Sequence, residues 1–393
     1  MKSALFEEAQ ALQGQTVALR RDIHRHPELG LHLPRTRATV LEALSDLDLD
    51  ITLSNETSGI VATLHGARPG PSVLLRGDMD ALPMPEQTGL DFSSTEAGCM
   101  HACGHDAHTA NLLGVARVLA KHTSHISGKV LLIFQPGEEG FAGGEKMIQD
   151  GMFDDFKIDE VYALHNWPEL PLGTFGVNSG PMMAAVDEFD ITVKGKGGHA
   201  ASPHLAIDPV VISAQVISAV QTIISRSTDP VDKALISITK INAGTAYNVI
   251  DDQVKMGGTI RTFRRETRAY IEKRLNELCK GIADAHGAEI KIEFDLVNKY
   301  PPTINSKEET KFAANVAKDL VGDDKVITDI DPSMGGEDFS YLLEKKPGSY
   351  LYLGQGDEEH SAHLHTTKYD FNDNLLPIGV NFWVDLVQKY FSK

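Results

Sequence analysis

The stretch Val130-Leu131-Leu132-Ile133-Phe134-Gln135-Pro136-Gly137-Glu138-Glu139 places a short apolar run directly before a turn and two adjacent carboxylates. A continuous apolar run of this length is typical of a strand that is buried on both faces of a sheet. Residues 161–164 repeat the pattern and are followed by His165. Both runs therefore predict buried strands with a reactive side chain just past the strand end.

The segments around these runs indicate alternating strands and helices. Residues 58–65 and 72–76 are predicted strands, and residues 105–121 carry apolar side chains at helical spacing. This alternation is typical of an α/β fold with a mainly parallel sheet and helices on both faces. In such sheets the active site lies past the carboxyl ends of the strands. We expect the polar residues at those ends to converge there: Asp78, Asp80, Glu138, Glu139 and His165.

A different pattern begins near Asp187 and predicts a second domain. Its order, β-α-β-β-α-β, is typical of a ferredoxin-like α+β unit. The predicted strands are 189–194, 234–241, 253–263 and 289–297, and the predicted helices are 208–226, with Asp208 as N-cap, and 267–286, ended by Gly287. Because helix and strand patterns, and His365, follow this unit, we expect a discontinuous first domain at 1–186 and 297–393. The lid-like domain at 187–296 is inserted into it.

Charge and composition exclude several classes of function. Lys and Arg total 37 against 55 Asp and Glu, so the net charge is −18. This acidity argues against nucleic-acid binding and against an anionic membrane surface. Three cysteines are too few for a disulfide framework and suit a reducing compartment. Because we find neither a signal peptide nor an apolar run of about 18 residues, we predict a cytoplasmic protein.

The residues past the strand ends form a ligand set for a divalent transition metal. Thiolate, imidazole and carboxylate groups suit such ions. Gly104 lets the backbone turn so that Cys103 and His105 converge. His165 and His365 each follow an apolar residue in the same manner, and His363 is an alternative to His365. His24 and His26 are instead expected to build local structure.

The pair Glu138–Glu139 adds a candidate general base. Two adjacent carboxylates repel each other, and a metal bound by one of them removes much of that repulsion. The other carboxylate is then placed to accept a proton from metal-activated water. A solvated acidic turn is the alternative. Together with the ligand set, the pair predicts a metal-dependent hydrolase.

The inserted domain carries three further candidates. His199 ends the glycine-rich part of residues 195–204, where its imidazole is suited to stabilising a developing oxyanion. A flexible hairpin tip is the alternative for this loop. Arg261 is a candidate for binding a substrate carboxylate, and Asn248 for adding a hydrogen bond. For both, an internal structural role is an equal alternative.

Seven segments resemble the hippurate hydrolase and N-acyl-amino-acid amidohydrolase branch of the aminoacylase–carboxypeptidase metallohydrolases, which also includes plant indole-acetyl-amino-acid hydrolases. They are 21–28 (RDIHRHPE), 75–83 (LRGDMDALP), 100–108 (MHACGHDAH), 134–139 (FQPGEE), 164–166 (LHN), 195–204 (GKGGHAASPH) and 335–339 (GGEDF). The resemblance covers nearly the whole chain in order.

This resemblance implies a dinuclear metal site and a homo-oligomer. The implied ligands are Cys103, His105, Glu139, His165 and His365, with Glu138 as base. The two divalent ions are expected to be zinc or manganese, with cobalt and nickel as alternatives. The resemblance also implies a dimer or tetramer formed through the inserted domain, and a role for His199 in stabilising the transition state.

The expected substrate is a small N-acyl or N-aroyl L-amino acid, cleaved to a carboxylate and a free amino acid. A metal-dependent dipeptidase or aminopeptidase is the alternative enzyme. A metal-binding protein without catalysis is a third hypothesis. Glu138 argues against it, because metal binding alone does not require a second carboxylate.

Overall fold

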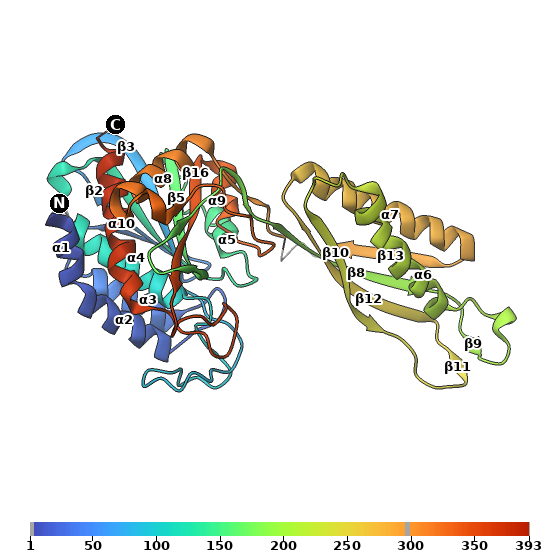
Figure 1. Cartoon of the computed structure of the whole chain (residues 1–393). Helices are drawn as coiled ribbons and strands as arrows, with labels where there is room; N and C mark the ends of the chain where they lie inside the picture. Colours follow the sequence, from blue (N-terminus) through green and yellow to red (C-terminus); the bar gives the residue numbers. More distant parts are fainter. Residues whose placement is uncertain (1–3, 295–298, 393) are drawn as a thin grey trace. The chain divides into compact units, whose positions relative to one another are not determined.

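The computed structural model describes residues 4–294 and 299–392. The chain forms two compact units (Figure 1). Unit 1 comprises Met1–Met182, Ile304–Asp331 and Asp338–Lys393, and unit 2 comprises Met183–Thr303 and Pro332–Glu337. The predicted boundaries of the inserted domain are 187 and 296, which leaves residues 332–337 in the first domain. In the structure, residues 332–337 group with unit 2, where the Ala184 N–H donates to the carbonyls of Ser333 (3.0 Å) and Gly335 (2.9 Å).

Unit 1 is built on an eight-stranded sheet of order β1-β2-β4-β3-β5-β16-β6-β15. The four central strands, β4, β3, β5 and β16, run parallel, which confirms the predicted mainly parallel sheet. The strands are β1 Asp50–Leu53, β2 Ile60–His65, β3 Arg68–Asp78, β4 Ser127–Gln135, β5 Glu160–Pro171, β6 Phe175–Gly176, β15 Val326–Ile327 and β16 Gly348–Gly356.

The helices of unit 1 pack on this sheet and on one another. They are α1 Ala4–Ala11, α2 Gln13–Arg25, α3 Pro34–Leu44, α4 His105–Leu119, α5 Gly143–Gln149, α8 Lys307–Val321, α9 Ser340–Lys345 and α10 Leu376–Tyr390. Helix α4 packs between β3 and α10, with Val115 and Val118 fully buried (Figure 1). Its N-cap, Gly104, has φ +94°. A β-carbon there would lie 2.3 Å from Asn166 Oδ1, so only glycine fits.

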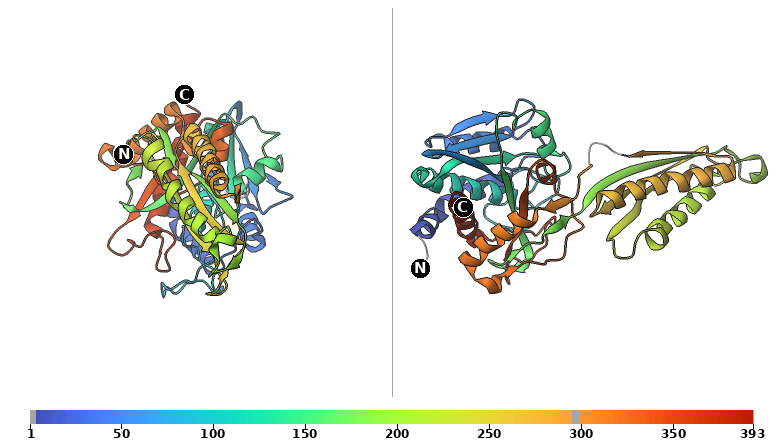
Figure 2. Two further views of the ribbon diagram at one scale, coloured as in Figure 1. Left: turned by 90° about the vertical axis from the view of Figure 1, so that its right-hand side faces the viewer. Right: turned by 90° about the horizontal axis from the view of Figure 1, so that it is seen from above.

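Unit 2 has the ferredoxin-like order β-α-β-β-α-β. Its antiparallel sheet has the order β10-β12-β8-β13, and Figures 1 and 2 show both helices on one face. The elements are β8 Ala185–Lys194, α6 Pro209–Thr222, β10 Ala234–Asn242, β12 Gln253–Thr262, α7 Arg265–His286 and β13 Glu289–Phe294. The last predicted strand extended to 297, and its residues 295–297 lie outside the described residues.

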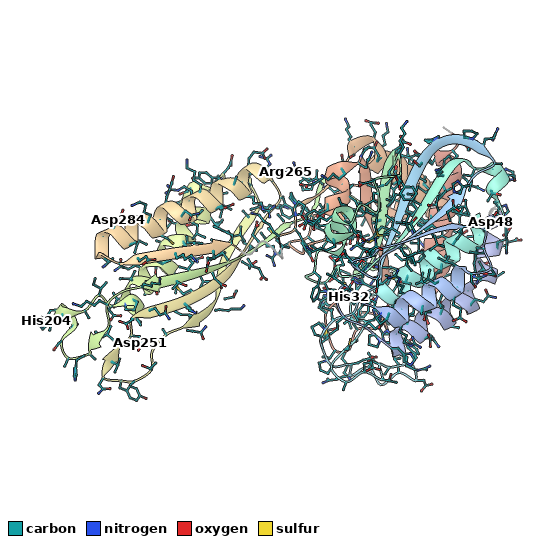
Figure 3. The ribbon with its side chains drawn as sticks, turned by 180° about the vertical axis from the view of Figure 1, so that it is seen from behind. His32, Asp48, His204, Asp251, Arg265 and Asp284 are labelled. Atoms are coloured by element: carbon teal, nitrogen blue, oxygen red, sulfur yellow. The ribbon has the colours of Figure 1, made fainter. Side chains whose placement is uncertain are left out.

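The ends of the two helices follow the predicted capping. The Asp208 carboxylate accepts the Val210 N–H at 2.9 Å, and Gly287 ends α7 with φ +64°. Two short strands, β9 Gly198–His199 and β11 Val249–Ile250, pair at one end of unit 2. Figure 3 labels His204 and Asp251 at that same end. Strands β7 Gly180–Met183 and β14 Thr303–Asn305 occupy the segments that lead into and out of unit 2.

Helix α6 departs from the sequence analysis in two respects. It ends at Thr222 and continues as a π-helical turn, Ile223–Ser227, rather than as α-helix to 226. Together, Pro209–Ser227 are long and apolar enough to cross a membrane by length and composition, although no such stretch was expected. Ile212 and Val216 are buried in the core of unit 2, so packing accounts for part of this apolar character.

Candidate metal centre

The predicted ligands converge beyond the carboxyl ends of β3, β4 and β5 in unit 1. One ligand atom from each of Cys103, Glu139 and His365 lies within 4.8 Å of the others, and the same holds for His105, Glu138 and Glu139. Glu139 belongs to both groups. The Cys103 Sγ lies 3.4 Å from Nε2 of the remaining candidate, His165. The structure thus brings all six residues together.

His365 reaches the cluster through an unusual backbone conformation. Its φ is +60°, which is uncommon for a residue other than glycine and often marks functional positions. Its N–H donates to the Ala102 carbonyl at 2.8 Å, and its Nε2 lies 3.1 Å from Glu139 Oε1. The alternative candidate, His363, is exposed like His365, but its Nδ1 lies 2.7 Å from Glu169 and it belongs to neither of the two ligand groups. The geometry therefore favours His365 over His363.

The donor set fits divalent metal ions. Thiolate, imidazole and carboxylate groups are the ligands that zinc and its neighbours accept in proteins. His105 is fully buried, and its Nε2 and Nδ1 each lie 3.5 Å from a carboxylate oxygen, of Asp78 and Asp80 respectively. This separation is longer than that of a strong hydrogen bond. A cation bound in this centre would take one of these nitrogens as a ligand.

The charges around the centre also favour a cation. Burial alone lowers the pKa of His105, but the carboxylates of Asp78 and Asp80 outweigh it and raise that pKa to about 10. Burial, together with the negative charges of Glu139 and Glu138, raises the pKa of the Cys103 thiol well above its usual range. A divalent ion would relieve this excess of negative charge and allow the thiol to ionise.

Asp80 fixes the turn that carries the carboxylate pair. Its two carboxylate oxygens accept the N–H groups of Glu138 and Glu139, each at 3.0 Å. Gly137, which precedes the pair, has φ +72°. Sequence analysis placed Asp80 at this edge of the sheet but assigned it no role. Because a pairing between residues nearly sixty positions apart leaves no local pattern, only the structure identifies it.

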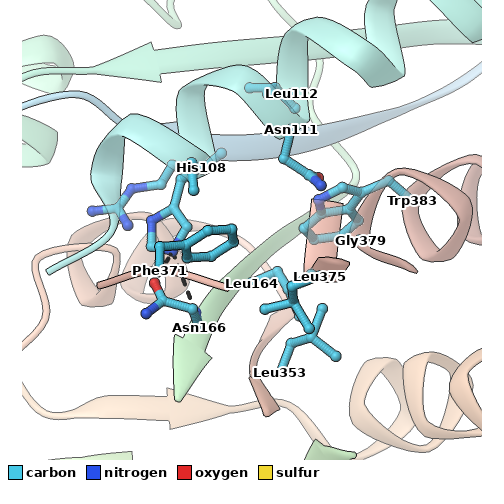
Figure 4. Close-up of a pocket in the computed structure, with 12 residues that line it drawn as sticks. His108, Asn111, Leu112, Leu164, Asn166, Leu353, Phe371, Leu375, Gly379 and Trp383 are labelled. Carbon is cyan, nitrogen blue, oxygen red and sulfur yellow. Dashed lines mark hydrogen bonds between the residues drawn. The ribbon is translucent and has the colours of Figure 1, made fainter. Parts of the chain in front are cut away.

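His108 links the strands that carry Asp78 and His165. Its Nδ1 lies 2.5 Å from Asp78 Oδ1, and its Nε2 lies 2.7 Å from Asn166 Oδ1 (Figure 4). The rings of His108 and His165 are 4.6 Å apart between centroids. His108 is not among the residues predicted from the sequence. The available signal was its spacing, because residues three apart on α4 share a helix face, as His105 and His108 do.

A buried network of ion pairs and hydrogen bonds holds Asp78 in place next to the candidate metal centre. Arg76 contacts Asp78 at 2.6 Å and Asp338 at 2.9 Å, and Gln135 Nε2 donates to Asp338 at 2.8 Å. All four residues are buried. Beside them, a cavity of about 30 Å³ is lined by Arg76, His108, Asn111 and Trp383 among others (Figure 4). It has room for one water molecule but not for a substrate.

The three candidates of unit 2 occupy different environments. His199 is exposed on β9, and its Nδ1 accepts the Ala201 N–H at 3.1 Å, so the neutral ring carries its proton on Nε2. Asn248 is exposed, and its carbonyl accepts the Ala200 N–H. Arg261 is partly buried on β12 and donates to the Ile260 carbonyl and to Thr259. Burial lowers the pKa of Arg261, against the opposing charges of Glu188 and Asp187.

Comparison with known proteins assigns the family. Residues 74–389 match the profile of peptidase family M20/M25/M40. The chain belongs to this family. It is 38% identical over 388 residues to the hippurate hydrolase of Campylobacter jejuni, which covers 99% of this chain and 100% of the relative. It is 36% identical over 378 residues to the N-acetylcysteine deacetylase of Bacillus subtilis, with 96% and 97% covered.

A solved structure agrees with this family assignment. The Bacillus subtilis YXEP protein, a dinuclear metal binding peptidase from the M20 family, superposes with a TM-score of 0.84 and is 33% identical, covering 98% of this chain and 99% of that one. The predicted family membership and α/β fold are confirmed. So is the prediction of a metal-dependent amidohydrolase.

Proposed function

We propose that this protein is a dinuclear metal-dependent amidohydrolase that cleaves N-acyl or N-aroyl L-amino acids to a carboxylate and a free amino acid. The observation that carries the proposal is the presence of two groups of potential metal ligands that share Glu139, one of which also contains Glu138. Two full-length relatives are named for N-acyl amino acids, as a hippurate hydrolase and an N-acetylcysteine deacetylase. Both the geometry and these relatives support hydrolysis of a linear amide.

The proposed metal ligands are Cys103, His105, Glu139, His165 and His365. We propose zinc or manganese as the native ion, with cobalt and nickel as alternatives, because thiolate and imidazole suit these metals. When bound, the ions would polarise the amide carbonyl and make a water molecule easier to deprotonate. Asp80 holds the backbone of Glu139 in place, which limits the motion of that ligand.

Glu138 is the proposed general base. Its backbone is fixed by Asp80, and its carboxylate lies in the same group as His105 and Glu139. In this position the carboxylate would take the proton of the attacking water and pass it to the nitrogen of the leaving amino acid. Glu138 itself is almost fully buried. Burial keeps competing water away from that proton transfer.

We assign substrate contacts to unit 2. His199 would donate its Nε2–H to the developing oxyanion. Arg261 would hold the carboxylate of the amino-acid moiety, and Asn248 would add a hydrogen bond. A homo-oligomer, dimer or tetramer, would form through unit 2, where Val210 and Val211 on α6 are exposed apolar residues. A cytoplasmic location is also proposed, since Cys99, Cys103 and Cys279 are all free.

A substrate panel tests this proposal. Metal is removed by chelation, each of the four metals is restored in turn, and hydrolysis of hippurate, an N-acetyl amino acid and a dipeptide is compared. We expect metal-dependent cleavage of the two N-acyl compounds. Faster cleavage of the dipeptide would instead favour a dipeptidase or aminopeptidase, the second candidate, which the peptidase description of the YXEP protein supports. No metal-dependent turnover of any of the three would refute both.

A further inference from the structure

Two exposed apolar side chains lie beside the turn that carries Glu138 and Glu139. Phe141 is 46% exposed and Leu29 is 43% exposed, and both belong to unit 1. Single exposed apolar residues are ordinary on protein surfaces. The Phe141 ring packs against Gly30, the neighbour of Leu29, and Phe141 follows Glu139 by two residues, so the exposure of both side chains calls for an explanation from function.

The ring of Phe141 packs against Gly30, the residue that follows Leu29. A β-carbon at Gly30 would be 3.3 Å from two carbons of the Phe141 ring, and Gly30 has φ +73°. Glycine therefore allows the ring to approach the backbone closely. The Cβ of Phe141 also packs beside Gly137, at 3.2 Å from where a β-carbon of that glycine would be. Gly30 thus contacts the ring of Phe141 and Gly137 contacts its Cβ, while nearly half of the residue stays exposed.

Leu29 is held against the segment that follows β3 and contains Asp80. It forms a parallel β-bridge with Ala81, whose N–H donates to the Glu28 carbonyl at 2.9 Å. Ala81 directly follows Asp80, the residue whose carboxylate binds the N–H groups of Glu138 and Glu139. Leu29 therefore pairs with the residue next to Asp80, and Phe141 follows Glu139 by two residues in the sequence.

We propose that Phe141 and Leu29 form an acyl-binding surface that selects bulky apolar acyl groups, aroyl groups above all. This inference rests on the proposed function, because that function places the scissile carbonyl at the metal centre. A charged amino-acid carboxylate gains nothing from an apolar surface, so the acyl side of the substrate is the part that this surface fits. A benzoyl ring would bury apolar area against Leu29 and pack on the Phe141 ring. An acetyl group offers only one methyl for the same contact.

The test varies the acyl group and holds the amino acid constant. N-benzoylglycine and N-acetylglycine are compared on the metal-loaded wild type and on Phe141→Ala, Leu29→Ala and Phe141→Leu. For Phe141→Ala, kcat/KM with N-benzoylglycine should fall about tenfold or more, the size expected for losing apolar contacts in a binding pocket. With N-acetylglycine it should change less than about threefold. Leu29→Ala should show the same selectivity to a smaller degree, and Phe141→Leu should retain much of the preference.

Leu53→Ala is the matched control. Leu53 is 41% exposed on β1 of the same unit, and it should leave the ratio of the two substrates unchanged. Metal content and thermal midpoint of each variant establish that the fold is intact. Equal losses on both substrates, or the same selectivity change in Leu53→Ala, would overturn the acyl-binding surface. If the wild type cleaves other N-acyl amino acids and the Phe141 and Leu29 variants leave the ratio unaltered, only this inference fails. If the wild type cleaves no N-acyl amino acid, the proposed function is refuted, and this inference is refuted with it.

Discussion

The two units hold their candidate residues in opposite ways. In unit 1, Cys103, His105 and His165 are buried, and buried ion pairs join His105 to Asp78 and Arg76 to Asp338, whereas His365 is exposed. In unit 2, His199 and Asn248 are exposed. The Ala201 N–H donates to His199 Nδ1, and the Ala200 N–H donates to the backbone carbonyl of Asn248. Buried, mutually supporting groups are preorganised for chemistry. Exposed groups are accessible to a substrate, so the difference separates the proposed reacting centre of unit 1 from the proposed substrate contacts of unit 2.

Replacing the proposed base should have the largest effect. Glu138→Gln keeps the shape of the side chain but cannot accept a proton at neutral pH. We expect kcat to fall about a hundred- to ten-thousand-fold with metal content unchanged. Steady-state kinetics together with metal analysis of the purified variant provide the measurement. A variant with near-normal turnover and both metals bound would show that Glu138 is not the base.

Breaking the buried network of unit 1 should destabilise the protein strongly. Asp338→Ala leaves Arg76 with a charge that has lost one buried partner, and removing such a partner typically costs about 3–5 kcal/mol. Urea unfolding measures the loss. The control is Asp284→Ala, which removes an exposed i,i+4 pair with Lys280 and should change stability little. Similar losses of stability from both variants would mean that the buried network of unit 1 contributes no more to stability than an exposed ion pair of unit 2.

The role of unit 2 is tested by His199→Ala. If His199 acts chiefly on the transition state, kcat should fall more than KM rises, by about a hundred- to a thousand-fold, as for the loss of one oxyanion donor. Metal content should stay the same. Loss of a metal ion would make His199 a ligand and remove the contrast between the units. A variant with unchanged kinetics would leave the β9 loop as a simple hairpin tip.

The smallest expected effect concerns the thiol ligand. Cys103→Ser should weaken metal binding at least about tenfold, since a neutral hydroxyl is a poorer ligand than a thiolate and even outer-shell changes reach this size. Metal retained after dialysis against a chelator is the measurement. Cys99→Ser is the matched control, because Cys99 is also buried and donates only to the Pro27 carbonyl. Equal metal retention in both variants would remove Cys103 from the ligand set.

The parts of the fold with a strong local pattern could be predicted from the sequence. Burial on both faces leaves β4 a continuous apolar run, and the glycine of Cys103-Gly104-His105 marks the start of α4. Such signals lie within a few residues of each other. They were enough to locate the six residues that converge at the metal centre.

Features that depend on distant pairings could not be predicted in this way. The position of β16 between β5 and β6 joins segments nearly two hundred residues apart. Asp78 and His108 are separated by thirty positions, and neither shows in sequence that it pairs with the other. That residues 332–337 belong to unit 2 could not be predicted for the same reason, because backbone hydrogen bonds between remote segments leave no periodicity in the sequence.

The position of His365 has a consequence for biosynthesis. Its N–H is bonded to Ala102, beside Cys103, although the two segments are separated by most of the chain, and β16 completes the centre of the sheet only with residues 348–356. During synthesis, Ala102 emerges from the ribosome long before His365 does, and contacts of such high sequence separation form late. The proposed ligand set would therefore be incomplete until the segment that carries His365 has emerged and folded. Metal ions held by all five proposed ligands would stabilise only chains in which this late segment has folded.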